Sequence, residues 1–253
     1  DTNEDGISGK VNKVWSPITQ SYELGKFSWK ASKASLEHQN LSALFTDIGI
    51  SSWLFPSPEG DCTLNQAHCI EIAQTTETHL EIASQQLSVE ASREMTDLLL
   101  AFTQVMNTKN EINQAITSAQ PASKQGQALF SELACLQCHH ASFNIPKESG
   151  SDIIEAYNIS PYSDFLLHDM GDALADNRSE FNANGQEWRT TPLWGISAYL
   201  KQARTPHFLH DGRAHSVLEA ILWHGGEAEK SKQAFINLTK NQRLKLIEFV
   251  ESL

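Results

Sequence analysis

The segment LACLQCHHASF contains Cys135 and Cys138, with two residues between them, followed at once by His139. Two thiols at this spacing can form thioether bonds to the two vinyl groups of a haem, and the next histidine then lies under the iron as an axial ligand. A thioredoxin-like pair would need a surrounding βαβ pattern, and a zinc site would need a second Cys or His pair at finger spacing; the sequence has neither. The segment therefore predicts one covalently bound haem c.

The first candidate for the second axial ligand of the haem iron is His224. A helix that begins after Ser216 carries Val217, Ala220, Ile221 and His224 at helical spacing, which places the histidine on the buried face. A histidine on an apolar face is more often a core residue than a ligand. Here a haem must be housed nearby, and imidazole is a natural iron ligand, so we expect His224 to bind the iron.

The segment YSDFLLHDM supplies the next two candidates, Met170 and then His168, and we expect it to form a short helix. His210, in the sequence HDG, is expected to order a turn by hydrogen bonding with the adjacent backbone.

The hydrophobic pattern predicts a mainly α fold, with no alternating strand series. Helices are expected over residues 35–49, from about 67, over 92–106, over 123–140, after 216, and over 239–253. Ser216 with Glu219, and Thr239 with Gln242, match the capping-box pattern at the last two helix starts. The pattern changes near residue 120, so we expect a loop-rich and helical segment over 1–120 and a haem domain over 121–253.

The composition is acidic, with 19 Lys and Arg against 31 Asp and Glu and a net charge of −12. This charge argues against binding to nucleic acid or to anionic membrane surfaces, and it favours a basic redox partner. No apolar run approaches the roughly 18 residues of a membrane span. The opening DTNEDG has no apolar leader, so the chain is expected to be processed or truncated.

The remaining cysteines, Cys62 and Cys69, are expected to form a disulfide; two unpaired thiols are the alternative. Disulfides persist in oxidising compartments, where c-type haem proteins also reside. We therefore expect a periplasmic or otherwise exported protein.

The first residues of the chain are a candidate calcium site. Asp1, Asn3 and Asp5 occupy the first, third and fifth positions of an EF-hand-like loop with Gly6 at the turn, although Asn12 stands where the final Glu is expected. A solvated acidic turn is the alternative.

Two groups of motifs carry a resemblance to known families. GQALFSELACLQCH resembles the first helix of cytochrome c domains, in which the glycine, here Gly126, permits close crossing with the C-terminal helix. EWRTTPLWGISAYLKQARTPHFLHDGRAHSVLEAILWHGGEA resembles the C-terminal haem domain of bacterial di-haem cytochrome c peroxidases. Counted from HDG, His224 falls where those peroxidases place the methionine ligand of their electron-transfer haem.

A closer resemblance, over essentially the whole chain, is to the bacterial di-haem oxidoreductase family, often labelled thiol oxidoreductase-like. The segments that carry it are GKFSWKA, DIGI, LLHDMG, EWRT, HDGRA and WHGGEA, in this order. That family has two haem motifs and this sequence has one, so the chain is identified as a C-terminal portion.

The resemblance implies an electron-transfer haem domain of a peroxidase-like di-haem oxidoreductase. Its partner would be an electron-donor protein or the N-terminal haem domain, and it would be part of an enzyme only together with that N-terminal half. The alternatives are an enzyme that reduces peroxide or a small oxidant at this haem itself, and a haem-free binding module.

Arg189, at the head of the shared EWRT motif, is expected to pair with a haem propionate, because a planar guanidinium matches a carboxylate bidentately. Arg213 is a second candidate. An ordinary structural ion pair is the alternative for each.

Overall fold

The computed structural model describes residues 5–57, 59–60, 62–71, 90–91, 93–95, 97–98, 123–145 and 157–253. The chain divides into two compact units. The first comprises Asp1–Asn12, Trp29–Ala31 and Lys109–Leu253, and the second Lys13–Ser28 and Ser32–Thr108. The expected boundary between residues 120 and 121 lies outside the described residues and stays a prediction.

The second unit contains a hairpin and a helix. Strands β1 (Lys13–Ser16) and β2 (Ser21–Leu24) pair antiparallel, and helix α1 (Leu36–Ile48) follows. Ser35 caps α1 by accepting a hydrogen bond from the His38 N–H, and Gly49 ends it at φ 76°. The helix predicted over 35–49 is therefore confirmed. A second helix begins at Ala67, as expected, whereas most of the one predicted over 92–106 lies outside the described residues.

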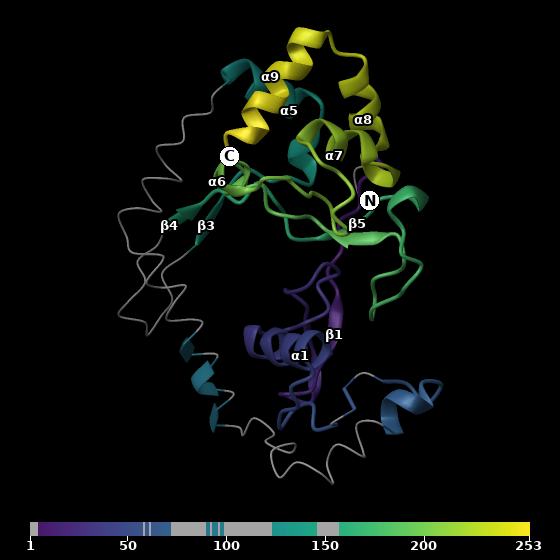
Figure 1. Ribbon diagram of the computed structural model, residues 1–253. Helices are drawn as coiled ribbons and strands as arrows, with labels where there is room; N and C mark the ends of the chain where they lie inside the picture. The colour runs from purple at the N-terminus through teal and green to yellow at the C-terminus, as the bar shows by residue number, and fades with distance from the viewer. Residues whose placement is uncertain are drawn as a thin grey trace. The chain divides into compact units, whose positions relative to one another are not determined.

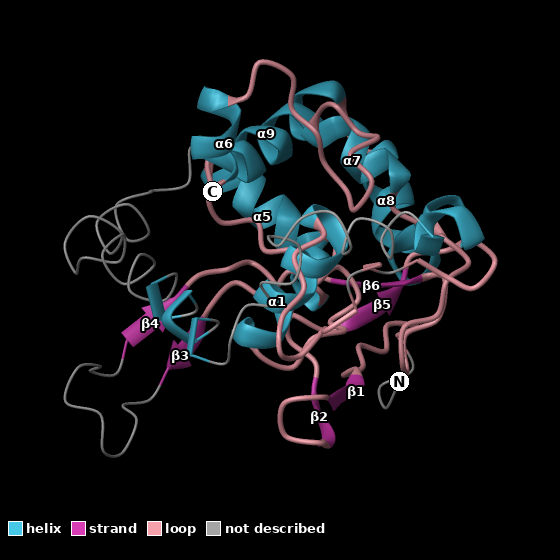
Figure 2. Cartoon of the chain, turned by 60° about the horizontal axis from the view of Figure 1, so that its bottom comes forward, coloured by secondary structure: helices cyan, strands magenta, loops and turns pink. Residues whose placement is uncertain are grey.

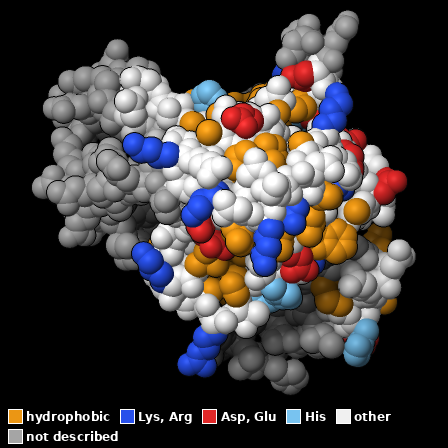
Figure 3. Space-filling model, turned by 90° about the horizontal axis from the view of Figure 1, so that it is seen from above, with side chains coloured by type: hydrophobic (Ala, Val, Ile, Leu, Met, Phe, Trp, Pro, Cys, Tyr) orange, Lys and Arg blue, Asp and Glu red, His pale blue; other side chains and the backbone are white. Residues whose placement is uncertain are grey.

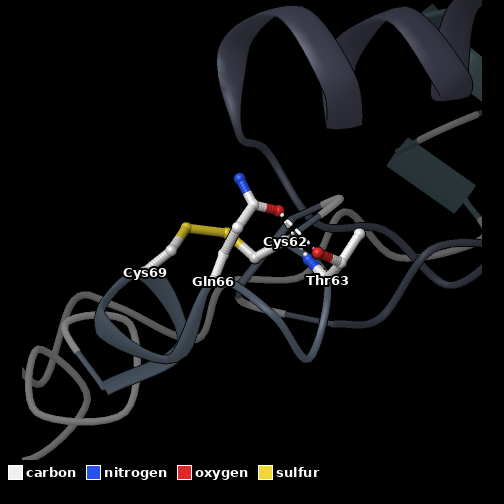
Figure 4. The surroundings of a disulfide bond; sticks show 4 residues. All are labelled: Cys62, Thr63, Gln66 and Cys69. Carbon is white, nitrogen blue, oxygen red and sulfur yellow. Dashed lines mark hydrogen bonds between the residues drawn. A yellow bond between two sulfur atoms is a disulfide. The ribbon is translucent and has the colours of Figure 1, made fainter.

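The predicted disulfide between Cys62 and Cys69 is confirmed. The two cysteines are joined, and the turn between them is held by Gln66, whose side-chain oxygen accepts hydrogen bonds from the Thr63 N–H and hydroxyl (Figure 4). The bond links the loop after α1 to the helix that begins at Ala67.

The described part of the first unit is mainly α, with short strands between the helices (Figure 1, Figure 2). Its α-helices are α5 (Lys124–Glu132), α6 (Ile196–Gln202), α7 (Val217–Trp223), α8 (Glu229–Ile236) and α9 (Lys240–Glu251). Three 3₁₀ turns are η1 (Cys135–Gln137), η2 (Asp172–Leu174) and η3 (Gly226–Ala228). β3 (Phe143–Ile145) pairs antiparallel with β4 (Tyr157–Ile159), and β5 (Leu167–Asp169) with β6 (Glu187–Arg189).

The core of the first unit lies between α5 and α9, which cross closely (Figure 1). Gly126 is the reason that they can: a Cβ on this residue would overlap the Lys245 carbonyl oxygen and lie 2.7 Å from the Cβ of Phe249. The expected close crossing of the two helices is therefore present. The buried residues of this core are Leu129, Phe130, Leu133, Val217, Phe235, Leu246, Phe249 and Val250.

The short helix predicted for YSDFLLHDM is wrong, because this segment is a bend followed by β5. Tyr162 and Phe165 adopt positive φ of 50° and 60°, which a helix does not allow. Leu167 and Asp169 then pair with Arg189 and Glu187 of β6. The partner strand is about 20 residues away in sequence, so a local hydrophobic pattern does not reveal the pairing.

The capping box predicted at Thr239 and Gln242 is present in full. Thr239→Ala is expected to lower the free energy of unfolding by about 1 kcal/mol, because the substitution leaves a helix N–H without its cap. Urea denaturation followed by circular dichroism measures the change. Lys240→Ala, the next residue along, is the control and should change the midpoint little; equal effects of the two substitutions would contradict the capping argument.

The surface of the first unit mixes apolar and charged side chains, as Figure 3 shows for one face. The large apolar side chains of this unit that are exposed by a third or more are Val11, Trp29, Phe181, Trp194, Tyr199, Leu218, Leu222, Trp223, Ile236 and Leu244. Among the residues that the structure describes, no helix has the length and apolar character to span a membrane.

Candidate functional site

The first unit encloses a cavity of about 380 Å³, a size typical of small-molecule and cofactor sites. All five residues predicted to hold a haem line it: Cys135, Cys138, His139, Arg189 and His224. Ligand side chains from η1, β6 and the end of α7 therefore meet in one place. Much of the remaining wall is apolar, including Phe130, Leu193, Ile221, Phe235 and Leu246.

The two cysteines are presented by a tight turn at the end of α5. Ala134 adopts a left-handed conformation, with φ 61°, and turns the chain into η1, after which the His139 N–H donates to the Cys135 carbonyl oxygen. Neither thiol is in a disulfide. Burial raises the pKa of the Cys135 thiol to about 12, whereas a redox-active Cys-x-x-Cys pair needs a lowered pKa. The surroundings thus argue against the thioredoxin-like alternative.

His139 is held so that one ring nitrogen faces a backbone acceptor. Its Nδ1 lies 2.9 Å from the carbonyl oxygen of Tyr162 and donates to it, which leaves the lone pair on Nε2. Burial lowers the pKa of His139 to about 4, so the ring is neutral. A neutral imidazole whose second nitrogen is fixed by a carbonyl group is the usual form of a metal ligand.

His224, which also lines the cavity, has the same arrangement. It is the C-terminal capping residue of α7, and its Nδ1 donates to the carbonyl oxygen of Ala220 at 2.7 Å. Burial lowers the pKa of His224 as well, which again leaves a neutral ring with its lone pair on Nε2.

The centroids of the His139 and His224 rings are 6.5 Å apart. Two metal–nitrogen bonds of about 2 Å, plus about 1 Å from nitrogen to centroid in each ring, give a separation of about 6 Å for imidazoles on opposite sides of one ion. The ring separation is therefore compatible with both histidines binding one haem iron, and the nearby thiols and apolar wall are of the kinds that hold a porphyrin.

His168, the third candidate ligand, is occupied at both ring nitrogens. Nδ1 lies 2.7 Å from a Glu227 oxygen and Nε2 lies 2.8 Å from an Asp164 oxygen. Burial alone would lower the pKa of His168, but hydrogen bonds to Asp164, Cys138 and Glu227 raise it to about 11. Two carboxylates occupy both ring nitrogens and favour the imidazolium form, so neither nitrogen is available to iron in this arrangement. Met170, the second candidate, lines the cavity and stays the second candidate for an iron ligand after His224.

Asp164 and Glu227 were not identified from the sequence. Asp164 stands only four residues before His168 in the sequence, but Glu227 follows His168 by 59 residues. Gly225 and Gly226 bring it there: a Cβ on Gly225 would lie 2.9 Å from the Met170 carbonyl oxygen, and one on Gly226 would overlap the Asp169 carbonyl oxygen. This close approach explains the two glycines after His224.

The sequence predicts that His210 orders its turn by hydrogen bonding with the adjacent backbone, and this prediction is wrong. Its ring stacks on Trp188 with centroids 3.5 Å apart, and Lys30 Nζ lies 4.4 Å from the same indole. The hydrogen bond that closes the turn comes instead from His207, whose Nδ1 donates to the Gly212 carbonyl oxygen. Lys30 is 1% exposed and is held by Asp176, 2.6 Å away.

The two arginines differ in their surroundings. Arg189 lines the cavity, and burial lowers the pKa of its guanidinium. Arg213 lies over the Trp223 ring and hydrogen bonds to Asp211 and to the Ala173 carbonyl oxygen. Of the two, Arg189 is therefore the one placed to meet a propionate in the cavity.

The predicted calcium site is only partly visible, because Asp1 and Asn3 lie outside the described residues. The Asp5 carboxylate accepts hydrogen bonds from the Ile7 N–H and the Gln137 side chain. Among the residues that the structure describes, no group of three or more acidic, His or Cys side chains could hold a metal ion. The calcium site stays a prediction.

A cavity lined by Cys-x-x-Cys-His and by a second neutral histidine is typical of haem proteins. The family described as "Di-haem oxidoreductase, putative peroxidase" matches residues 1–253. The chain belongs to this family, whose cofactors are haems. Comparison with curated proteins and with solved structures gave no match.

Proposed function

We propose that the first unit is a cytochrome c-like domain that carries one haem c and transfers electrons within a peroxidase-like di-haem oxidoreductase. Cys135 and Cys138 would attach the haem, and His139 and His224 would bind its iron. The observation that supports this most directly is the 6.5 Å separation of the two neutral histidine rings.

The bound haem supplies a one-electron redox couple. The residues of the chain attach it, orient the ligands and exclude water. Tyr162 and Ala220 orient the two imidazoles through their carbonyl groups, which keeps each Nε2 directed at the cavity. The Arg189 guanidinium pairs with a propionate. The apolar wall keeps solvent from the ring.

Binding by both His139 and His224 would favour electron transfer over reaction of a small oxidant at this haem, because an oxidant such as peroxide would have to displace one of the two histidines. Both imidazoles are held by short backbone hydrogen bonds, 2.9 and 2.7 Å, which oppose such a movement. Since the family is described as di-haem, this domain would pass electrons from a donor protein to the second haem, where peroxide would be reduced.

The proposal includes an exported, oxidising location, which the Cys62–Cys69 disulfide supports. It also includes a donor with a basic surface, which the net charge of −12 supports.

The test is the haem content of the chain made in cells that attach c-type haem. Mass spectrometry under denaturing conditions should show one added haem, because thioether bonds survive unfolding. The double variant Cys135→Ser, Cys138→Ser should lose this added mass. Cys62→Ser with Cys69→Ser is the matched control and should keep it. An unmodified wild-type chain would refute the proposal.

The spin state of the iron separates transfer from direct reaction. A six-coordinate low-spin spectrum in both oxidation states is expected for two histidine ligands. A high-spin spectrum would show an open position and would favour the alternative, in which peroxide or another small oxidant is reduced at this haem.

A further inference from the structure

A second histidine pair, His207 and His215, lies in the loop between α6 and α7 (Figure 1), and His207 also lines the cavity described above. The loop doubles back on itself: Phe208 and Ala214 form an antiparallel bridge, and the Phe208 N–H donates to the Ala214 carbonyl oxygen at 2.8 Å. In that register the next residues outward, His207 and His215, stand directly opposite each other. Directly opposed residues have Cβ atoms about 5 Å apart and extend to the same face.

Both rings of this pair have the same nitrogen fixed by the backbone. His207 Nδ1 donates to the Gly212 carbonyl oxygen at 3.0 Å, and His215 Nδ1 donates to the Pro206 carbonyl oxygen at 3.1 Å. Each ring therefore carries its lone pair on Nε2 when neutral. Both residues are exposed.

The distance between the rings suits two ligands on neighbouring corners of one ion. The centroids are 4.8 Å apart and the planes are inclined at 75°. With metal–nitrogen bonds of about 2 Å and an angle at the metal of about 100°, two imidazoles have centroids about 5 Å apart. This differs from His139 and His224, whose larger separation suits opposite sides of an ion.

The surrounding contacts hold the pair in place and favour a cation. The Tyr199 hydroxyl accepts from the His207 N–H at 2.7 Å. The Glu219 carboxylate accepts from the His215 N–H at 2.7 Å, which also places a negative charge at the backbone of His215. Backbone and ring positions are therefore set before an ion arrives, which lowers the entropic cost of binding.

We propose that His207 and His215 form a binding site for one divalent transition metal ion, with water completing its coordination. Imidazole ligands suit copper, nickel and zinc, and affinity should follow the order Cu²⁺ above Ni²⁺ and Zn²⁺. The ion would join the two arms of the loop that carries His210, whose ring stacks on Trp188 in the cavity wall. Metal binding would thereby stabilise the position of this loop in the cavity wall.

The test is titration of the purified full chain with Cu²⁺ and, separately, Zn²⁺, followed by calorimetry. Cys135 and Cys138 must be haem-linked or, if free, alkylated, so that their thiols do not compete. One tight Cu²⁺ is expected, with a paramagnetic resonance spectrum that shows two nitrogen ligands. Because the readout is binding, it does not depend on electron transfer.

His207→Asn and His215→Asn are the diagnostic variants, since asparagine can keep the donor near the Nδ1 position but has no counterpart of Nε2. Each should weaken Cu²⁺ binding at least about tenfold, a loss that is typical even of changes to groups that only orient metal ligands. His68→Asn, at a histidine whose side chain is 86% exposed, is the control and should leave the tight site unchanged. Thermal melting checks that the variants fold. Absence of Cu²⁺ binding in the wild type, or equal affinity in the double variant, would overturn the proposal.

Discussion

Replacing His224 by alanine is expected to convert the low-spin haem spectrum of this chain to a high-spin one while leaving the haem covalently attached. The reason is that different residues of the proposed site attach the haem and bind its iron. Cys135 and Cys138 hold the porphyrin, His139 binds one side of the iron, and His224 alone supplies the opposite nitrogen at a fitting distance. Removing its imidazole opens the sixth coordination position. Optical and resonance spectra of both oxidation states measure the change.

Two further variants make this test specific. Met170→Leu should leave the spectrum unchanged; if it instead abolishes the low-spin form, Met170 and not His224 is the ligand. His224→Met should keep a six-coordinate iron but raise the reduction potential, because thioether ligation favours the reduced state. A folded, haem-loaded His224→Ala chain with the wild-type spectrum would exclude His224 as ligand.

Gly126→Ala is expected to destabilise the first unit by about 3 kcal/mol or more, at the upper end of the range for overpacked cores. The added methyl group has no room, because it would overlap the Lys245 carbonyl oxygen and press on Phe249. The obstacle is largely backbone, which cannot rotate away, so α5 and α9 must separate. That separation also moves the turn that carries Cys135. Thermal unfolding and haem incorporation yield are the measurements.

Gln127→Ala is the matched control for this substitution, since Gln127 is the next residue of α5 and is exposed. Alanine there is a good helix former and should change stability by a few tenths of a kcal/mol at most. If Gly126→Ala were as stable as Gln127→Ala, the helix crossing would not be the reason for the glycine.

Features that depend on residues close together in sequence could be predicted from the sequence. The spacing of Cys135, Cys138 and His139 alone predicts covalent attachment of a haem, which stays a prediction, and the structure places all three residues in the wall of one cavity. Helices α1 and α9 begin at capping residues and carry apolar stripes, and both appear where expected. The capping box predicted at Ser216 and Glu219 is only half present. The Ser216 hydroxyl accepts from the Glu219 N–H, but the Glu219 carboxylate accepts from the His215 N–H and not from the Ser216 N–H.

Features that depend on distant residues were decided by the tertiary structure. Helical spacing placed His224 on a buried face, but only the folded chain sets its ring 6.5 Å from that of His139. His168 looked like a ligand in the sequence, yet Asp164 and Glu227 occupy both of its nitrogens. Whether a histidine offers a lone pair or a positive charge depends on which groups the fold brings to it. Local sequence determines which side chains are available for chemistry here, and long-range packing determines which of their atoms remain available to bind.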